Sequence, residues 1–180
     1  MSVYTYSLAK DGDRQLSTNF VVKEFRCFDN SDKILVDSEL AKILQKVRDH
    51  FGKPIEITSG YRTAAHNKKI GGASNSQHLY GKAADFHISG VAPIEICKYL
   101  EQIGAHGLGC YSSWVHVDTR EGKSYWDQRN GTYKSVSTFG AVSFAKIVKD
   151  KAGLGDATIT YLEAYQYGAD LIEKLAAAMK

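Results

Sequence analysis

The chain has 180 residues, of which 43% are hydrophobic and 24% charged, as in a globular protein of one domain or of one domain with a short appendage. The formal net charge of +3 is too small to indicate a nucleic-acid-binding protein. No stretch is long and apolar enough to span a bilayer, so membrane insertion is not expected.

The cysteines and the first residues bear on the compartment. Cys27, Cys97 and Cys110 form no even set and show no C-x-x-C spacing, which favours free thiols in a reducing compartment. The opening MSVYTYSLAKDGDRQLS lacks a basic start followed by an apolar run, so no secretion signal is predicted. We therefore expect synthesis in the cytoplasm, with a target outside it reached by another route.

The first third of the chain contains one clear helix. Residues 1–17 are predicted to be a surface arm, and residues 19–25 fit either a short strand or an irregular docking segment. A helix begins at a cap, Asp37 or Ser38. Its apolar residues recur at helical spacing before a glycine and a proline stop it: Leu40, Ile43, Leu44, Val47 and Phe51, then Gly52 and Pro54.

The middle of the chain is predicted to alternate strands, loops and short helices. The order is a strand at 55–58, the tetrapeptide S-G-Y-R at 59–62, a helix at 63–70 capped by Thr63, a glycine-containing loop at 71–77 and a strand at 82–89. In the last strand, the apolar residues share one face, while Asp85 and His87 share the other. Asp85 is therefore expected on a polar face.

The remaining elements complete an α+β pattern. Pro93 begins a helix through Ile103, and two strands at 107–111 and 114–119 form a hairpin. Residues 121–140 are polar and contain several glycines, which predicts a long loop or linker. Two helices are expected at 141–151 and 156–179, and Gly168 is a candidate break. We expect a domain at 1–130 and a helical segment at 141–180. The apolar stripes of these helices include Val142 and Tyr165, and the segment is expected to dock on the main domain or to pair with another chain.

Three side chains that are distant in sequence suggest a metal site. His78 follows the glycine-containing loop, Asp85 lies on the polar face of its strand, and His116 lies on the second strand of the hairpin. On that strand Trp114, His116 and Asp118 share one side, opposite two valines. Two histidines and a carboxylate leave a tetrahedral zinc with one open position, which is typical of a hydrolytic site.

These residues carry a resemblance to a known family. The pattern S-x-H-x-x-G-x-A-x-D is present from Ser76 to Asp85, preceded by S-G-Y-R and followed by V-H-V-D at 115–118. In this order the three blocks resemble the zinc D-Ala-D-Ala carboxypeptidases and L,D-endopeptidases that cut bacterial peptidoglycan, most of all the small bacterial and phage members. The resemblance implies an α+β fold like that of Hedgehog signalling domains, with an antiparallel sheet packed against helices. It also implies Zn²⁺ bound by His78, Asp85 and His116.

The resemblance also suggests roles for neighbouring residues. Arg62 would grip or polarise the substrate, with a structural salt bridge as its alternative. Many relatives carry Glu or Asp three residues before the last histidine ligand, as general base; this chain has Ser113 there. Asp118 is our candidate for that base, or else it orients a ligand; His106 and Glu121 are weaker candidates for the base.

Other side chains have alternative roles. Ser76 and Trp114 are predicted substrate contacts. Trp114 and Tyr111 fit either the lining of a substrate groove or simple packing, and packing is favoured for Tyr111. His87 is a rival ligand. A thiol enzyme using Cys110 lacks a local feature that would lower the pKa of the thiol.

The expected function is zinc-dependent hydrolysis of peptidoglycan stem peptides, at D-Ala-D-Ala or at an internal bond such as L-Ala-D-Glu. The missing secretion signal suits a phage-type endolysin that acts at the bacterial cell wall after release. The alternative is a non-catalytic, metal-binding wall-recognition or assembly module. The helical segment at 141–180 would bind wall, form a homodimer or brace the enzyme.

Overall fold

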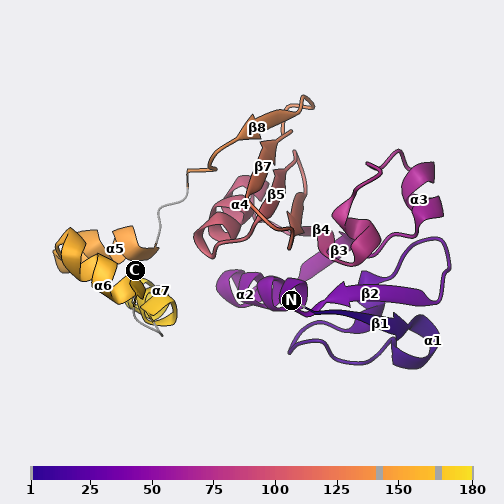
Figure 1. Cartoon of the computed structure of the whole chain (residues 1–180), viewed down its shortest axis with the longest axis horizontal. Coiled ribbons are helices and arrows are strands. Elements are labelled where there is room, and N and C mark those ends of the chain that lie inside the picture. Colours follow the sequence, from indigo (N-terminus) through magenta and orange to yellow (C-terminus); the bar gives the residue numbers. More distant parts are fainter. Residues whose placement is uncertain (1, 141–143, 165–167, 180) are drawn as a thin grey trace. The chain divides into compact units, whose positions relative to one another are not determined.

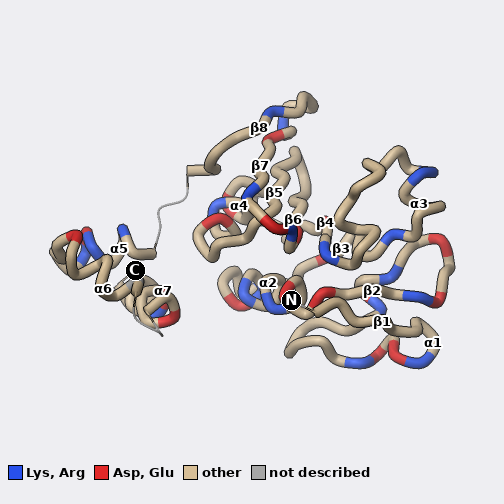
Figure 2. Tube along the Cα trace, viewed as in Figure 1, with Lys and Arg blue, Asp and Glu red and all other residues tan. Residues whose placement is uncertain are grey.

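The computed structural model describes residues 2–140, 144–164 and 168–179 of the chain (Figure 1). The chain forms two compact units, Met1–Phe139 and Gly140–Lys180. The first unit contains two β-sheets and several helices, which confirms the predicted α+β class. Lys and Arg are interspersed with Asp and Glu along the trace of both units, so no long run of one sign forms (Figure 2).

A six-stranded sheet is the scaffold of the first unit. Its strand order is β3-β4-β6-β5-β7-β8. The strands are β3 Ile55–Ser59, β4 Ala83–Ile88, β5 Gly107–Cys110, β6 Val115–Asp118, β7 Ser124–Asp127 and β8 Lys134–Val136. The predicted hairpin is confirmed as β5–β6. The expectation of an antiparallel sheet is wrong at one pair, because β5 and β7 are parallel.

One face of this sheet belongs to the hydrophobic core. The helix α4, Pro93–Gln102, packs on β5 and β6, and its Ile96 and Leu100 are buried. Burying a side chain of this size stabilises the fold by about 1.5–3 kcal/mol. The sheet contributes alternate residues to this core, all of them buried: Ala84, Phe86, Ile88, Leu108, Cys110, Val115 and Val117.

The opposite face carries a row of residues that crosses four neighbouring strands. Asp85 on β4 pairs with His116 on β6, which pairs with Gly109 on β5, and Gly109 pairs with Trp126 on β7. The next row contains Asp118 beside Gly107. The sequence alternation that buries the apolar residues therefore places these polar residues together on the other face.

The helices begin and end close to where their capping residues predict. Asp37 caps α2, Ser38–Phe51, by accepting a hydrogen bond from the backbone N–H of Glu39, and Gly52 ends α2 in the left-handed conformation with φ of 63°. Thr63 caps α3, Ala64–Lys69. The remaining short helices of this unit are α1 Leu8–Asp11, η1 Val22–Phe25 and η2 Gln77–Tyr80, where η marks a 3-10 helix.

The predicted N-terminal arm is wrong. Strand β1, Val3–Ser7, pairs antiparallel with β2, Lys33–Asp37, in a separate two-stranded sheet. Residues 19–25 were predicted to be either a short strand or an irregular segment. They form the irregular segment, because the 3-10 helix η1 occupies most of the range. A pairing between strands about thirty residues apart leaves no local periodicity, so the sequence pattern did not reveal it.

Gly81 is a point of contact between the two sheets. It has a φ of 67°, and a Cβ built there would lie 2.5 Å from the backbone carbonyl of Leu35 on β2. The carbonyl of Gly81 also accepts a hydrogen bond of 2.8 Å from the backbone N–H of Asp37. Strand β2 therefore packs directly against the turn that follows His78, where only glycine fits.

The predicted loop at 121–140 is also wrong. It contains β7 and β8, which extend the main sheet past residue 130. Both strands are short and only partly buried, and β8 forms the edge of the sheet. Polar edge strands lack the apolar alternation that marks a strand in a sequence.

The second unit consists of helices in its described part. These are α5 Phe144–Ala152, α6 Asp156–Ala164 and α7 Gly168–Ala178, with a small core of Val148, Ile159, Ile172 and Ala176. Within the predicted helix at 156–179 the structure describes α6 and α7, and residues 165–167, directly before the candidate break at Gly168, lie outside the described residues. The predicted stripe residues Val142 and Tyr165 lie outside the described residues. Among the described helices, none has the length and hydropathy needed to cross a membrane.

Candidate metal centre

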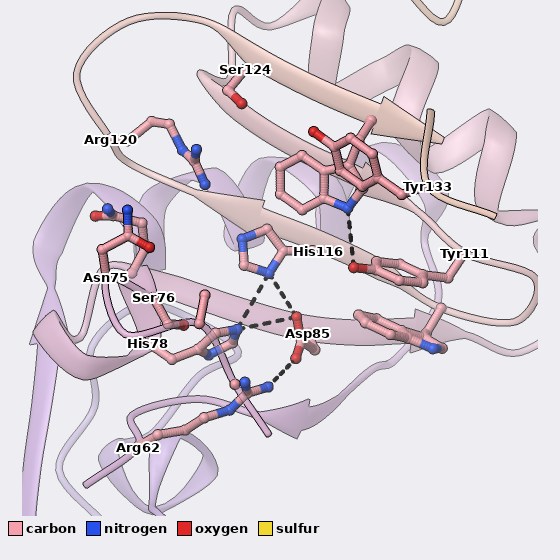
Figure 3. Close-up of a pocket in the computed structure, with 15 residues that line it drawn as sticks. Arg62, Asn75, Ser76, His78, Asp85, Tyr111, His116, Arg120, Ser124 and Tyr133 are labelled. Carbon is pink, nitrogen blue, oxygen red and sulfur yellow. Dashed lines mark hydrogen bonds and ion pairs between the residues drawn. The ribbon is translucent and has the colours of Figure 1, made fainter. Parts of the chain in front are cut away.

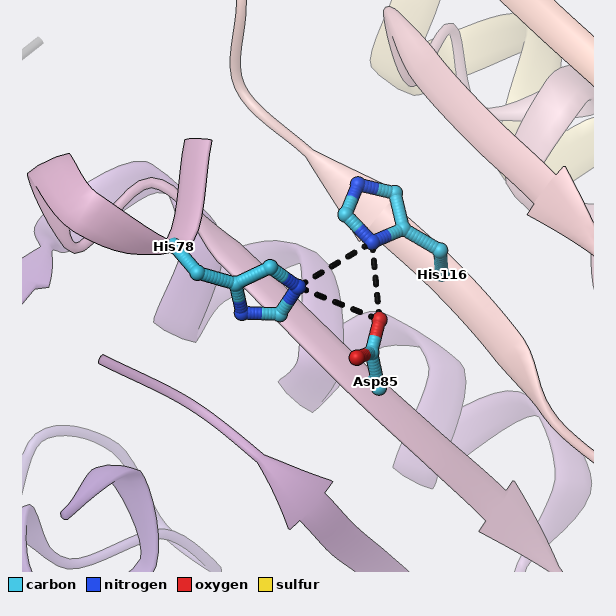
Figure 4. A group of neighbouring side chains, drawn as sticks. All are labelled: His78, Asp85 and His116. Atoms are coloured by element: carbon cyan, nitrogen blue, oxygen red, sulfur yellow. Dashed lines mark hydrogen bonds and ion pairs between the residues drawn. The ribbon is translucent and has the colours of Figure 1, made fainter. Parts of the chain in front are cut away.

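His78, Asp85 and His116 converge on one point (Figure 4). The Nε2 atom of His78 lies 3.2 Å from Oδ1 of Asp85 and 3.3 Å from Nδ1 of His116, and that Nδ1 lies 2.8 Å from the same Asp85 oxygen. Strands β4 and β6 place the last two side chains opposite each other, and η2 brings His78 over them. The structure thus brings together the three predicted ligands.

Each of the three side chains is held from behind by another group. His78 donates its Nδ1–H to the carbonyl oxygen of Gly60 at 2.7 Å, so its Nε2 lone pair faces the centre. His116 donates its Nε2–H to Oδ2 of Asp118 at 2.9 Å, so its Nδ1 faces the centre. Such outer partners fix the ring orientation and the tautomer of a metal-binding histidine.

The third side chain, Asp85, is held by Arg62. The Nη2 atom of Arg62 donates to Oδ2 of Asp85 at 2.5 Å, and Nε donates to Oγ of Ser59 at 2.8 Å. Oδ1 of Asp85 is left to face the two histidines. Arg62 also lines the pocket in front of the cluster, so it can both orient this carboxylate and face a substrate.

Burial and hydrogen bonding shift the pKa values in opposite directions. Burial lowers the pKa of His78, which is 2% exposed, and keeps its ring neutral. Burial also lowers the pKa of His116, but hydrogen bonds to Asp118 and Asp85 outweigh it and raise the pKa to about 9. Burial would raise the pKa of Asp85, but the two histidines that face its carboxylate outweigh burial and hold the pKa well below its ordinary value.

The cluster fits a metal ion. Tetrahedral zinc with bonds of about 2.0–2.1 Å requires its ligand atoms to be about 3.3 Å apart, and the three distances here are 2.8, 3.2 and 3.3 Å. With the outer nitrogens of both histidines donating, the two inner nitrogens and the carboxylate oxygen would hold a single cation, which takes the place of the proton on Nδ1 of His116. Two imidazoles and one carboxylate are a donor set that zinc accepts while keeping a fourth position open.

Asp118 lies behind His116 and does not face the centre. It is fully buried and accepts hydrogen bonds from the backbone N–H, Nε and Nη2 of Arg120 as well as from His116. Gly107 makes this possible, because a Cβ at that position would lie 2.1 Å from Oδ1 of Asp118. The geometry therefore favours the orienting role of Asp118, and the imidazole ring separates its carboxylate from the position where a base would be needed.

A pocket of about 410 Å³ opens in front of the cluster (Figure 3). The predicted substrate contacts Ser76 and Trp114 line it, together with Tyr111, Trp126 and Tyr133. The rings of Tyr111 and Trp114 are stacked with centroids 3.6 Å apart. Aromatic side chains thus form much of the wall on the side of β5, β6 and β7.

The remaining candidates lie elsewhere. Nε2 of His87 lies 3.4 Å from Oε2 of Glu56, and His87 borders a second, adjoining opening with Ser113. His106 hydrogen-bonds the carbonyl of Arg120, and neither it nor Glu121 lines the pocket. Cys110 is buried on the core face of β5, which gives the thiol-enzyme alternative no support.

Sequence reasoning missed Arg120 and Trp126 and gave Tyr111 a packing role. Trp126 reaches His116, with ring centroids 5.1 Å apart, by lying over Gly109, where a Cβ would be 2.5 Å from the indole. The alternation of glycines in G-L-G at 107–109 was a signal that larger neighbouring side chains cover this strand.

The comparisons with known proteins agree with this geometry. The pattern of the family described as Peptidase M15 matches residues 18–118. Peptidoglycan L,D-endopeptidase MepK of Escherichia coli strain K12 is 40% identical over 74 residues, which are 37% of this chain and 41% of the relative. Zinc D-Ala-D-Ala carboxypeptidase of Streptomyces albus G is 40% identical over 66 residues, or 36% of this chain and 25% of the relative.

A third relative, the probable peptidoglycan L,D-endopeptidase MepK of Haemophilus influenzae, is 42% identical over 72 residues, which cover 36% of this chain and 39% of the relative. The chain therefore spans about two fifths or less of the length of these relatives. The family pattern, however, matches more than half of the chain and includes all three members of the cluster. The chain belongs to the Peptidase M15 family.

Proposed function

We propose that the chain is a zinc-dependent peptidase that hydrolyses the stem peptides of bacterial peptidoglycan. The observation that carries the proposal is the cluster of His78, Asp85 and His116 at the base of an open pocket. The names of the relatives point to the same substrate class, either at an L,D bond or at D-Ala-D-Ala.

The residues around the centre suit this chemistry. A bound zinc ion would supply Lewis acidity toward a peptide carbonyl and lower the pKa of water from ~15.7 to about 7. Gly60, Asp118 and Arg62 hold the three ligands in place from behind. The guanidinium of Arg62, at the pocket wall, would bind a carboxylate or carbonyl oxygen of the stem peptide.

Digestion of purified cell walls tests the proposal. Zinc-loaded protein is expected to release peptide fragments, and mass spectrometry of these fragments identifies the bond. Metal-stripped protein and His116→Ala are the controls that should release none. If zinc-loaded protein releases nothing from walls of several chemotypes, the proposal is wrong.

A non-catalytic wall-recognition module is a second candidate. It is favoured by the absence, among the described residues that line the pocket, of any carboxylate other than that of Asp85. The relevant test compares wall binding and turnover in wild type, His116→Ala and metal-stripped protein. Binding that survives in all three, with no cleavage in any, would support the module.

The C-terminal unit and the site of action are further parts of the proposal. We propose action at the cell wall by an endolysin-like protein, with α5 to α7 binding wall or pairing two chains. The helices have a core of their own, which lets the unit be removed without cutting through the catalytic sheet. Sedimentation and wall-binding measurements on full chain and on a chain that ends at Phe139 would test both roles.

A further inference from the structure

Tyr111 is held at the rim of the metal centre by the β5–β6 hairpin. It directly follows β5, and its backbone N–H donates to the carbonyl of Trp114 at 3.0 Å. Its ring stacks on that of Trp114 with an interplanar angle of 9°. Both rings line the pocket, and in Figure 3 the phenol extends toward His116 and Asp85. The side chain is therefore fixed in a direction that faces the substrate space.

Trp126 fixes the hydroxyl group itself. Its indole Nε1–H donates a hydrogen bond of 3.0 Å to the phenol oxygen of Tyr111. The same indole lies over Gly109 and contacts the ring of His116. One side chain thus touches both a metal ligand and the hydroxyl, which ties the position of the hydroxyl to that of the centre.

The hydrogen of this hydroxyl is left to point into the pocket. Indole nitrogen can only donate, so the phenol oxygen accepts from Trp126 and its own hydrogen must find another acceptor. No acceptor for it is found among the described residues. Burial is the main cause that raises the pKa of Tyr111; the hydrogen bond from Trp126 and the charge of Arg62 lower it by less, and the charge of Asp85 raises it further, so the hydroxyl keeps its hydrogen at neutral pH.

The two arginines beside the centre use part of their hydrogen-bonding capacity to hold other side chains. Arg62 uses Nε and Nη2 for Ser59 and Asp85, and Arg120 uses the same two nitrogens for Asp118. The Tyr111 hydroxyl is a donor with its hydrogen uncommitted among the described contacts, on the pocket side of the cluster. This is the placement that a developing oxyanion requires.

We propose that Tyr111 is a catalytic residue whose hydroxyl donates a hydrogen bond to the carbonyl oxygen of the scissile peptide as negative charge develops there, and that Trp126 is its positioning residue. The hydrogen stays on the phenol oxygen throughout, so the step transfers no proton. The inference rests on the proposed peptidase function and adds a residue to its site.

The test uses Tyr111→Phe in the zinc-loaded full chain. Loss of one oxyanion donor lowers kcat on the order of 10²-fold, while KM and zinc content should stay unchanged. Calorimetric binding of a phosphinate analogue of the cleaved bond, whose tetrahedral oxygens mimic the oxyanion, should weaken by a similar factor. Tyr4→Phe is the matched control, since it removes the same hydroxyl group from a tyrosine that is 51% exposed and does not line the pocket, and it should behave like wild type.

The outcomes separate this role from the proposed function. Wild-type protein that cleaves no wall peptide refutes the peptidase and this role with it. Wild-type cleavage combined with unchanged kcat and unchanged phosphinate affinity in Tyr111→Phe refutes the role of Tyr111 alone. Trp126→Phe keeps a ring but removes the indole N–H, and it should lower kcat without raising KM; a change in KM alone would refute the positioning role.

Discussion

Replacement of Asp118 by asparagine would separate an orienting role from a proton-accepting role. The carboxylate accepts from Nε2 of His116 at 2.9 Å and from three nitrogens of Arg120. Asparagine keeps the shape but replaces one acceptor oxygen with an NH₂ donor. A donor would then face either the imidazole N–H or the guanidinium, and His116 would lose the group that fixes its tautomer.

The expected magnitude follows from these contacts. Loss of a partner that orients a metal ligand costs about 10- to 100-fold in metal affinity, or about 1.4–2.7 kcal/mol. Asp118 is fully buried and Arg120 is 30% exposed on its side chain, so loss of the charged hydrogen bonds should also lower the free energy of unfolding by about 1–3 kcal/mol. A residue that only accepted a proton would change turnover and leave zinc affinity as it was.

The assay is a zinc titration in competition with a chromophoric chelator, together with urea unfolding of the metal-free protein. The chain offers a matched control in Asp127→Asn. Asp127 makes the same set of bonds to Arg129, two residues on, but its side chain is 24% exposed and lies away from the cluster. Wild-type zinc affinity in a folded Asp118→Asn protein would refute the orienting role.

Three further outcomes are expected. Gly109→Ala should lower the free energy of unfolding, measured in urea, by about 1–3 kcal/mol, because the added Cβ would lie 2.5 Å from the indole of Trp126. Gly155→Ala is the control, since a Cβ there has nothing within 4 Å, and equal effects of the two substitutions would contradict the packing argument. Zinc at 100 times its Kd should stabilise the folded protein by about 2.7 kcal/mol, which raises the Tm until a chelator is added. His78→Ala should abolish this rise in Tm, and an unchanged Tm of the wild type would contradict the metal site. A chain that ends at Phe139 should unfold cooperatively and bind zinc with wild-type affinity, because all three candidate ligands and their outer partners lie in the first unit. If calorimetry shows that this shorter chain has lost zinc binding, the helical unit is needed for it.

The sequence predicted those elements whose signal is local. Helix α2 has both a cap and a regular apolar spacing, and the alternation in β4 correctly placed Asp85 opposite the apolar residues. The three cluster members were predicted because strand alternation and the resemblance pointed to the same residues. Local patterns were enough for the helix and the strand, whereas the complete set of three ligands also required the family resemblance.

The missed parts depend on contacts between distant segments. The pairing of β1 with β2 and the short strands β7 and β8 at one end of the main sheet have little local pattern. Asp118 was expected on the same strand face as His116, and it is, but the sequence did not reveal that the imidazole would stand between its carboxylate and the open side of the centre. The indole of Trp126 was missed because its reach depends on the empty space above Gly109.

The glycine at position 81 has a consequence for how such sequences are compared. The packing of the chain requires its left-handed backbone and its contact with Leu35, yet in the sequence it stands between two members of the candidate metal centre, His78 and Asp85. A homologue that keeps the histidine and the aspartate but carries a bulky residue there would have the right ligands on a displaced turn. Its inability to hold zinc would then originate in the packing of β2 against this turn rather than in coordination chemistry.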